Sequence, residues 1–362
     1  MKQKSGSVAR VLDNLGAPWR SWAAAHPLAS FLTSRILTMV AVLFLLGLGV
    51  FGLMSLAPGD IVDNYVRAQL LNSSSVMTQN NVLTAVEIAA MKHRLWLDRP
   101  FWEQYGHWLW RVLVDHDLGR SLLSQAPVLF LVSTRMVNSL ILNLLSLVFL
   151  TLTSFALGIW LSSKAGTKWD VAAGFVSLFL NAFPGILLLL LLQMFAASTR
   201  WFPVTAYPSE SFGGNFWAFS GSYLYHLTLP LLGAFLGGIG GSLRLIRATM
   251  LEQLGQPYVT ALRSRGISEG RIRFFHAFRN TMNPFITGAS GLLADLFSGS
   301  LILEIIFAYP GIGRLMYEAV IQKDINLVMT NIMFISFLIL AGMLLSDIAL
   351  ALVDPRIRYG KA

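Results

Sequence analysis

Six long apolar stretches constrain the fold of this 362-residue chain more than any other feature. Each is close to the roughly 20 residues that a helix needs to cross the hydrocarbon core of a membrane. The fifth counts as one span interrupted by Asp295, and no stretch shows the two-residue alternation of a membrane-spanning barrel. We therefore predict an all-α membrane protein with six transmembrane helices. The stretches are 36–57, 136–163, 171–199, 224–243, 284–294 with 296–303, and 325–346.

The distribution of lysine and arginine orients these spans. Short connections on the cytoplasmic side of a membrane protein carry an excess of both residues. Here that excess lies before residue 36, in the turn at 163–170, in segment 244–279 with its seven arginines, and in the last residues. We therefore expect both termini to be cytoplasmic. We also expect the first stretch to be a retained helix, because about 35 residues precede it and no small-residue cleavage site follows it.

The spans divide the chain into segments. Residues 1–34 form a cytoplasmic or interfacial extension, for which an amphipathic surface helix and a disordered tail are both open. The first transmembrane helix is expected at 35–57, and an extracytoplasmic loop with short helices at 58–135. The five-helix core is expected at 136–354 and includes a cytoplasmic loop at 251–282. A cytoplasmic tail occupies 355–362.

Residue types argue against catalysis by this chain. It has no cysteine, and it lacks the G-x-x-x-x-G-K-[ST] loop that cradles a nucleotide. The six histidines show no metal-binding spacing, so we expect no metal and no cofactor in this chain. Nucleic acid is a poor partner for the basic segment, which lies between two membrane spans.

Polar residues inside the apolar stretches predict a translocation path. A carboxylate at the centre of a membrane costs at least about 2.5 kcal/mol, so such groups face protein or a water-filled route. A proline within a span bends the helix and frees a backbone carbonyl. Local hydrogen bonding is the alternative role for the acids, and is equally open for Glu304 and Asp347. The residues expected along the path are Asn181, Pro184, Asp295, Glu304 and Asp347.

Glycines in the fourth stretch recur at intervals of four. Gly233, Gly237 and Gly241 would lie on one helix face, where small residues let a second helix approach closely. We expect this face to be a packing surface.

The basic segment "YVTALRSRGISEGRIRFFHAFRN" (258–280) carries more than charge. Its arginines do not share one helix face, and Gly266 and Gly270 divide it into two short helices. Apolar residues such as Phe274 and Phe275 would be out of place in a purely solvated loop. We therefore expect a docking element for a cytoplasmic protein.

Several motifs in order give the chain a family resemblance over residues 33–359. They include "LAPGD" (56–60), "DLGRSL" (117–122), "NAFPGILLLLLL" (181–192), "YVTALRSRGIS" (258–268) and "EIIFAYPGIGRLMYEAVIQKD" (304–324). The chain resembles the first, or B-type, permease subunit of bacterial ABC importers for dipeptides, oligopeptides and nickel. The resemblance implies a multi-pass protein of the bacterial inner membrane with the type I importer permease fold.

The resemblance also implies which residues couple the chain to an ATPase. In such permeases a short helix between spans four and five sits in a groove of the ATPase. Thr260 stands where the general importer motif has glutamate, and Pro257 stands where the peptide subfamily usually has an acidic residue. The implied coupling residues are Tyr258, Thr260, Ala261, Leu262, Arg263, Arg265, Gly266 and Ile267.

The partners that the resemblance implies are a second homologous permease, two ATPase subunits that bind ATP and magnesium, and an extracytoplasmic solute-binding protein. Docking of the binding protein is expected on the 58–135 loop and on the turn formed by Tyr309, Pro310, Gly311, Gly313 and Arg314. A peptide is the expected solute, with an oligosaccharide or a metal chelate as alternatives. The alternative functions are a proton-coupled secondary transporter and a membrane scaffold without transport.

Overall fold

The described residues of the computed structural model form helices and no β-strand. They are residues 27–56, 90, 92–93, 96, 98–121, 124–208, 215–282, 285, 296 and 300–353, with the backbone alone for 27–28, 346–347 and 349–353. Four helices among them are long and apolar enough to cross a membrane, or five if one strongly bent pair counts as a single span. The expected fifth stretch falls mostly outside the described residues. The all-α prediction therefore holds for the described residues, and the number six stays a prediction.

The chain forms two compact units. The first contains α2 (Pro27–Leu56), α5 (Phe101–Leu113) and the part of α17 (Ile325–Val353) that follows Asn331. Tyr105 of α5 is buried and donates a hydrogen bond to the Phe44 carbonyl of α2 over 3.0 Å. A Cβ on Gly47 of α2 would lie 2.7 Å from the Tyr105 hydroxyl oxygen. Glycine at this position thus lets α5 pack closely on α2.

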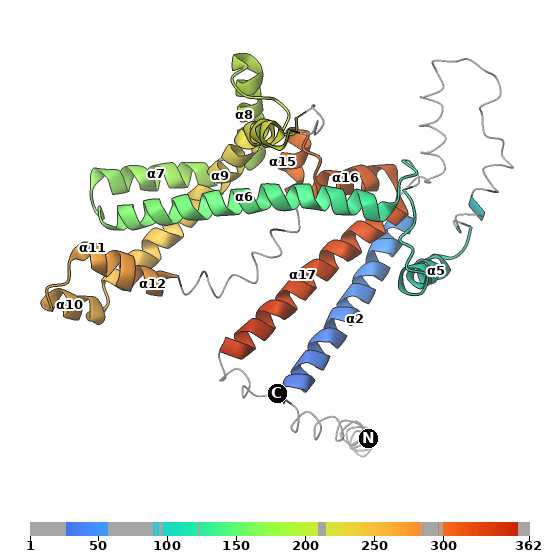
Figure 1. The fold of residues 1–362 in the computed structure, drawn as a ribbon, viewed down its shortest axis with the longest axis horizontal. Helices are drawn as coiled ribbons and strands as arrows, with labels where there is room; N and C mark the ends of the chain where they lie inside the picture. The colour runs from blue at the N-terminus through green and yellow to red at the C-terminus, as the bar shows by residue number, and fades with distance from the viewer. Residues whose placement is uncertain are drawn as a thin grey trace, which may run out of the picture. The chain divides into compact units, whose positions relative to one another are not determined.

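The second unit contains the other helices and the first residues of α17 (Figure 1). Two long helices, α6 and α9, form its framework, and α7 packs on α9. The short helices α10, α11 and α12 lie at the same end of the unit as the turn between α6 and α7. α16 packs on another part of α6. The elements are α6 (Val128–Ser162), α7 (Lys168–Ala182), α8 (Gly185–Thr199), α9 (Phe216–Leu254), α10 (Pro257–Ser264), α11 (Glu269–Arg271), the π-helical turn η1 (Ile272–Ala277), α12 (Phe278–Thr281), α15 (Leu301–Ile306) and α16 (Ile312–Gln322).

Glycines on α9 set how closely its neighbours approach, although the predicted face is only partly used. Gly233 lies against Leu189 of α8, whereas a Cβ on Gly237 would meet no atom of the described chain within 4 Å. The closest backbone approach is at Gly240, where a Cβ would lie 2.5 Å from the Ser177 carbonyl oxygen of α7. Gly240 lies outside the predicted row of glycines, which are four residues apart, because α7 packs one residue away from that row.

Candidate functional site

The segment predicted to couple the chain to an ATPase folds as a short helix, a glycine turn and a second helical piece. Pro257 occupies the first turn of α10, where its missing N–H group costs no hydrogen bond. Gly266 ends the helix with a φ of +75°, which glycine adopts without strain. The Ile267 and Gly266 N–H groups donate to the Leu262 and Arg263 carbonyls over 3.2 and 2.9 Å. This pair of bonds is the Schellman motif that closes helix C-termini, so the predicted break at Gly266 is confirmed. The break expected at Gly270 is wrong, because Gly270 lies inside α11.

An ion-pair cluster joins the two helical pieces. Arg263 donates to both carboxyl oxygens of Glu269, over 2.6 and 3.4 Å, and Arg273 lies 3.9 Å from the same carboxyl group. The Arg263 guanidinium holds the pKa of Glu269 below its usual value, chiefly through this hydrogen bonding. About half of each of the Arg263 and Glu269 side chains is exposed, so the cluster contributes little to overall stability. It links the last turn of α10 to the first residue of α11.

An apolar underside connects this segment to the long helices. Val259 of α10 and Ile272 of η1 are fully buried, and α10 packs on η1. Ala277 then packs with Met250 and Ile246 of α9 and with Ile159 of α6. Segment 257–281, which we call the coupling element, therefore packs on α9 through η1 and α12, and Ala277 also packs with Ile159 of α6.

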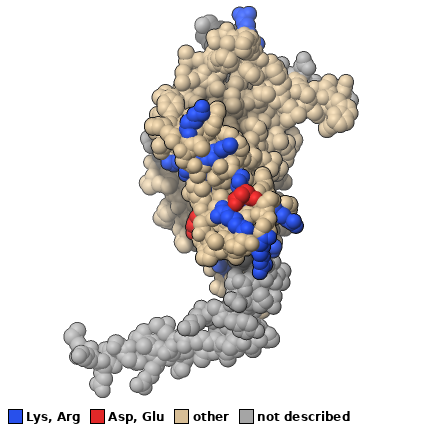
Figure 2. Space-filling view, turned by 90° about the vertical axis from the view of Figure 1, so that its left-hand side faces the viewer, with Lys and Arg blue, Asp and Glu red and all other residues tan. Residues whose placement is uncertain are grey.

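The outer face of the coupling element is basic and exposed. Figure 2 shows Lys and Arg side chains gathered over this end of the unit. Thr260, Ala261 and Arg265 are exposed, while Leu262 and Ile267 are half-buried. The half-buried Tyr258 donates from its hydroxyl to Gln253 Oε1 over 3.2 Å. Of the residues implied by the resemblance, those with free surface are thus Thr260, Ala261, Arg263, Arg265 and Gly266.

Two of the predicted path residues lie at a sharp bend. α7 ends at Ala182 and α8 begins at Gly185, and the two helices are bent by 97°. Pro184 precedes the first residue of α8, and Asn181 is exposed on the last turn of α7. The predicted proline break is confirmed.

The acids of the predicted path have different positions. Asp295 lies outside the described residues, and Asp347 lies in α17 at a position of which only the backbone is described. Glu304 of α15 is fully buried. Its carboxyl group accepts a hydrogen bond from the Ser139 hydroxyl of α6 over 2.6 Å, and another from the Arg314 N–H group over 2.8 Å. These contacts favour the local hydrogen-bonding role of Glu304 over a path lining.

The turn after α15 is built around this carboxyl group. Ser139 in turn accepts a hydrogen bond from the Ile312 N–H group over 2.7 Å, at the start of α16. A Cβ on Gly311 would lie 2.3 Å from the Glu304 side chain, and one on Gly313 would lie 3.1 Å from a carboxyl oxygen. Glycine is needed at both positions because the Glu304 side chain approaches closely, and neither glycine has a positive φ.

Burial limits what this turn can present to a partner. Tyr309 is fully buried, and its hydroxyl donates to the Asn138 carbonyl over 2.7 Å and lies 2.6 Å from the Tyr223 hydroxyl. Gly311 and Gly313 are also buried, whereas Pro310 and Arg314 are half-buried. The sequence analysis did not identify Ser139, Asn138 or Tyr223, because single polar residues in long apolar helices carry no signal of their distant partners.

Another pair absent from the sequence analysis joins α7 to α9. Asp170 is buried, and Arg247 donates to both of its carboxyl oxygens, one bond measuring 2.6 Å. The opposite charges of Asp170 and Arg247, at the ends of two spans, could have suggested an ion pair. The spacing of residues in the sequence does not show that these two residues are partners. Within the described part of the chain, no three His, Asp or Glu side chains gather as a metal site would need.

Comparison with known proteins gives a consistent set of relatives. The chain is 29% identical to the inner membrane ABC transporter permease protein YejB of Escherichia coli O157:H7, over 92% of this chain and 99% of the relative. It is 28% identical to the oligopeptide transport system permease protein AppB of Bacillus subtilis, over 92% and 100%. It is 27% identical to the dipeptide transport system permease protein DppB of Escherichia coli K12, over 86% and 93%.

A family model described as the inner membrane component of binding-protein-dependent transport systems matches residues 154–359, more than half of the chain. The match covers α9, the coupling element, the Glu304 turn and α17. Members of such a family are transport subunits of the membrane and not enzymes, and nothing in the match supports a proton-coupled transporter. This chain is a multi-pass inner membrane permease and belongs to the family of binding-protein-dependent transport system inner membrane components.

Proposed function

We propose that this chain forms half of the translocation path of an ATP-driven importer for peptides. The other half is a second homologous permease, and two ATPase subunits bind ATP with magnesium and hydrolyse it. An extracytoplasmic binding protein delivers the solute. ATP binding closes the ATPase pair, and the permeases respond because nucleotide favours one of their two conformations over the other.

The coupling element carries this proposal. Its outer face offers Thr260 and Ala261 to a groove, while Val259 and Ile272 are buried beneath it. α10 packs on η1, which packs on α9, so a movement of α10 can be passed to the long helices, as a mechanical link requires. Family membership supports the same role, since the matched region includes the whole element.

Residues that are buried in the structure are left out of the proposed translocation path and of the proposed docking surface. Asn181 and Pro184 at the bend, together with Asp295 and Asp347, remain the proposed path residues. Glu304 is proposed to hold the wall of the path in place and not to contact the solute. For the binding protein we propose contact through Pro310 and Arg314, and through the exposed side chains Tyr317, Val320 and Ile321 of α16.

Peptide is proposed as the solute because relatives that cover nearly the whole chain are named as oligopeptide and dipeptide permeases. If the binding protein binds an oligosaccharide or a metal chelate in place of a peptide, this choice of solute is wrong.

The proposed topology places six spans in the membrane with both termini and the coupling element in the cytoplasm.

The test is co-purification of the tagged chain with its partners from mild detergent. Ala261→Glu places a long charged side chain on the exposed face of α10 without disturbing the buried residues. We expect wild type to retain the second permease and the ATPase, and the variant to lose only the ATPase. Ala165→Glu is the matched control, because Ala165 is equally exposed in the neighbouring α6–α7 turn.

Two outcomes would contradict the proposal. If Ala165→Glu releases the ATPase and Ala261→Glu does not, the ATPase binds the other turn. If wild type retains neither an ATPase nor a second permease, the chain does not work in the proposed assembly.

A further inference from the structure

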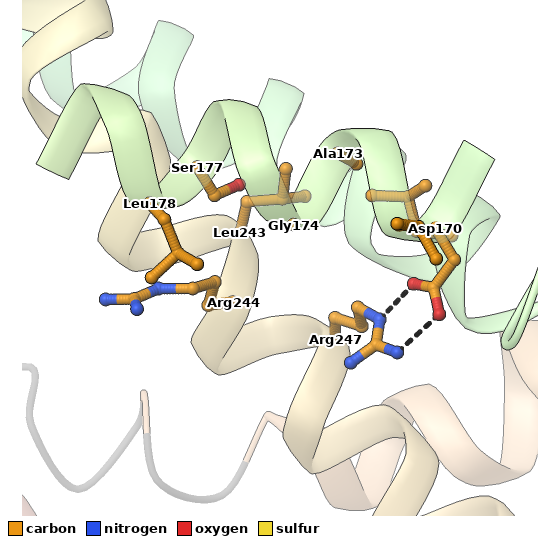
Figure 3. Close-up of a pocket in the computed structure, with 10 residues that line it drawn as sticks. Asp170, Ala173, Gly174, Ser177, Leu178, Leu243, Arg244 and Arg247 are labelled. Atoms are coloured by element: carbon orange, nitrogen blue, oxygen red, sulfur yellow. Dashed lines mark hydrogen bonds and ion pairs between the residues drawn. The ribbon is translucent and has the colours of Figure 1, made fainter. Parts of the chain in front are cut away.

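A cavity of about 320 Å³ opens between α7 and α9, near the end of the unit that carries the coupling element (Figure 3). Its wall is mostly apolar, with contributions from Leu161 of α6, Val171 and Leu178 of α7, and Leu243 of α9. Three charged side chains line it, Asp170, Arg244 and Arg247. A cavity with an apolar wall and a charged rim suits an amphipathic molecule.

The charges of the rim do not cancel. Arg247 is held by both oxygens of Asp170, which also accepts a hydrogen bond from the Gly166 N–H group over 3.0 Å. Arg244 is exposed, and its one hydrogen bond among the described residues is a 3.3 Å contact with the Gly240 carbonyl of its own helix. The positive charge of Arg244 is therefore not balanced by an acid of the rim, and its guanidinium N–H groups can bind an anion such as a phosphate.

We expect the cavity to lie at the depth of the lipid headgroups. Residues 216–243 of α9 contain no Asp, Glu, Lys or Arg, and at about 1.5 Å per residue they exceed the thickness of the hydrocarbon core. Arg244 is the first charge after this stretch. Trp160 and Trp169 form an exposed aromatic pair at the same end, with ring centroids 6.4 Å apart. Tryptophan gathers at membrane interfaces, which places this end of the helices in the headgroup zone.

The outer side of α7 continues the apolar wall. Val171, Phe175 and Leu178 are exposed by 54%, 71% and 52%, so an acyl chain can lie along α7 below the cavity. Basic pockets between transmembrane helices are known to bind anionic lipid headgroups. From this geometry we propose that the cavity binds the phosphate of an anionic phospholipid, with Arg244 as the principal ligand, the Asp170–Arg247 pair as a fixed wall, and the acyl chains along α7.

The test is native mass spectrometry of the transporter assembled around the full chain, without nucleotide or solute. We expect wild type to retain a phospholipid, with phosphatidylglycerol preferred over phosphatidylcholine. Arg244→Gln should lower its retention about tenfold, the order expected for loss of one charge-assisted phosphate contact. Arg135→Gln removes the same charge near the opposite end of α6 and should leave retention unchanged.

A second variant tests the cavity without changing charge. Gly174 lines the cavity, and a Cβ there would meet no atom within 4 Å, so Gly174→Leu can fill the space while the helix is kept. It should lower lipid retention as Arg244→Gln does. Inorganic phosphate at millimolar concentration should not displace the lipid. If it does, the site binds free phosphate and the lipid assignment falls.

The proposal is also overturned if Arg244→Gln and Gly174→Leu retain lipid as wild type does. It is overturned as well if wild type retains no lipid and Arg244→Gln releases the second permease, because a protein would then cover the cavity. None of these readouts depends on transport or on the solute, so they separate this proposal from the proposed function.

Discussion

The carboxyl group of Glu304 organises a turn that connects three helices. It accepts hydrogen bonds from the Ser139 hydroxyl of α6 and from the Arg314 N–H group in the first turn of α16. The Ser139 hydroxyl is buried and the Arg314 backbone N–H group is part-buried, and a buried donor without a partner costs far more than a hydrogen bond contributes on balance. Glycines at 311 and 313 leave room for the carboxyl group.

We expect Glu304→Ala to destabilise the protein strongly. The buried Ser139 hydroxyl loses its acceptor at a cost of about 1–3 kcal/mol, and the part-buried Arg314 backbone N–H group loses its acceptor at a smaller cost. The measurement is the thermal stability of the purified chain in detergent, followed by size-exclusion chromatography after heating.

Glu318→Ala is the control for the loss of an acid in the same region. Glu318 is 42% exposed and pairs with Arg314 one turn away, so its removal should cost less than about 1 kcal/mol. Equal stability of the two variants would show that the Glu304 hydrogen bonds do not hold the turn.

At this scale, sequence reasoning predicted which residues are unusual but not what they contact. Gly311, Gly313 and Glu304 were all singled out. The hydrogen-bonded turn that these three residues form together was not predicted, because Ser139 lies 165 residues from Glu304 in the sequence. A serine inside a long apolar helix has many possible partners, and only the packing of α6 against the turn selects one.

The coupling element depends on local chemistry that acts between its own pieces. The Schellman motif at Gly266 ends α10, and the Arg263–Glu269 pair fixes the following turn. The pair is largely exposed, so its effect should be seen in coupling to the ATPase and not in stability.

Exchange of the two charges tests this role. Arg263→Glu places a second acid beside Glu269, and Glu269→Arg places three arginines together, so each single variant should lower transport-coupled ATP hydrolysis about two- to fivefold. The double variant restores opposite charges and should recover most of the wild-type rate. Hydrolysis is measured on the reconstituted transporter with its binding protein.

Expression and thermal stability of all three variants should match wild type, which separates a coupling defect from misfolding. A double variant as poor as the worse single variant would mean that Arg263 acts on the ATPase directly and not through Glu269.

At the scale of elements, the sequence predicted helices and breaks well. The glycine turn at Gly266 and the proline break before Gly185 were expected, because glycine and proline act on their own backbone. The 97° angle between α7 and α8 and the π-helical turn at Ile272–Ala277 were not. α7, α8 and the π-helical turn all pack on α9, and no local pattern encodes that packing.

For the whole molecule, the membrane class followed from composition alone, because charge-free stretches of spanning length have few other folds. The cavity between α7 and α9 did not follow. It arises where Gly240 brings two helices together and the Asp170–Arg247 pair joins them near their ends. Neither feature has a spacing that a single sequence reveals.

The last prediction concerns topology. Lys164 lies in the turn between α6 and α7, Lys168 is the first residue of α7, and five arginines lie in segment 258–280. Positive charge in short connections favours the cytoplasm, so both connections should lie there, with the α5–α6 connection outside. We expect alkaline phosphatase to be active when fused after residue 125 and inactive when fused after residue 165. A fluorescent protein at the C-terminus should fold and emit, since it matures in the cytoplasm. Active phosphatase after residue 165, or a dark C-terminal fusion of normal abundance, would contradict six spans with cytoplasmic ends. With residue 165 outside the cytoplasm, the coupling element could not reach an ATPase, and the proposed mechanism would fail.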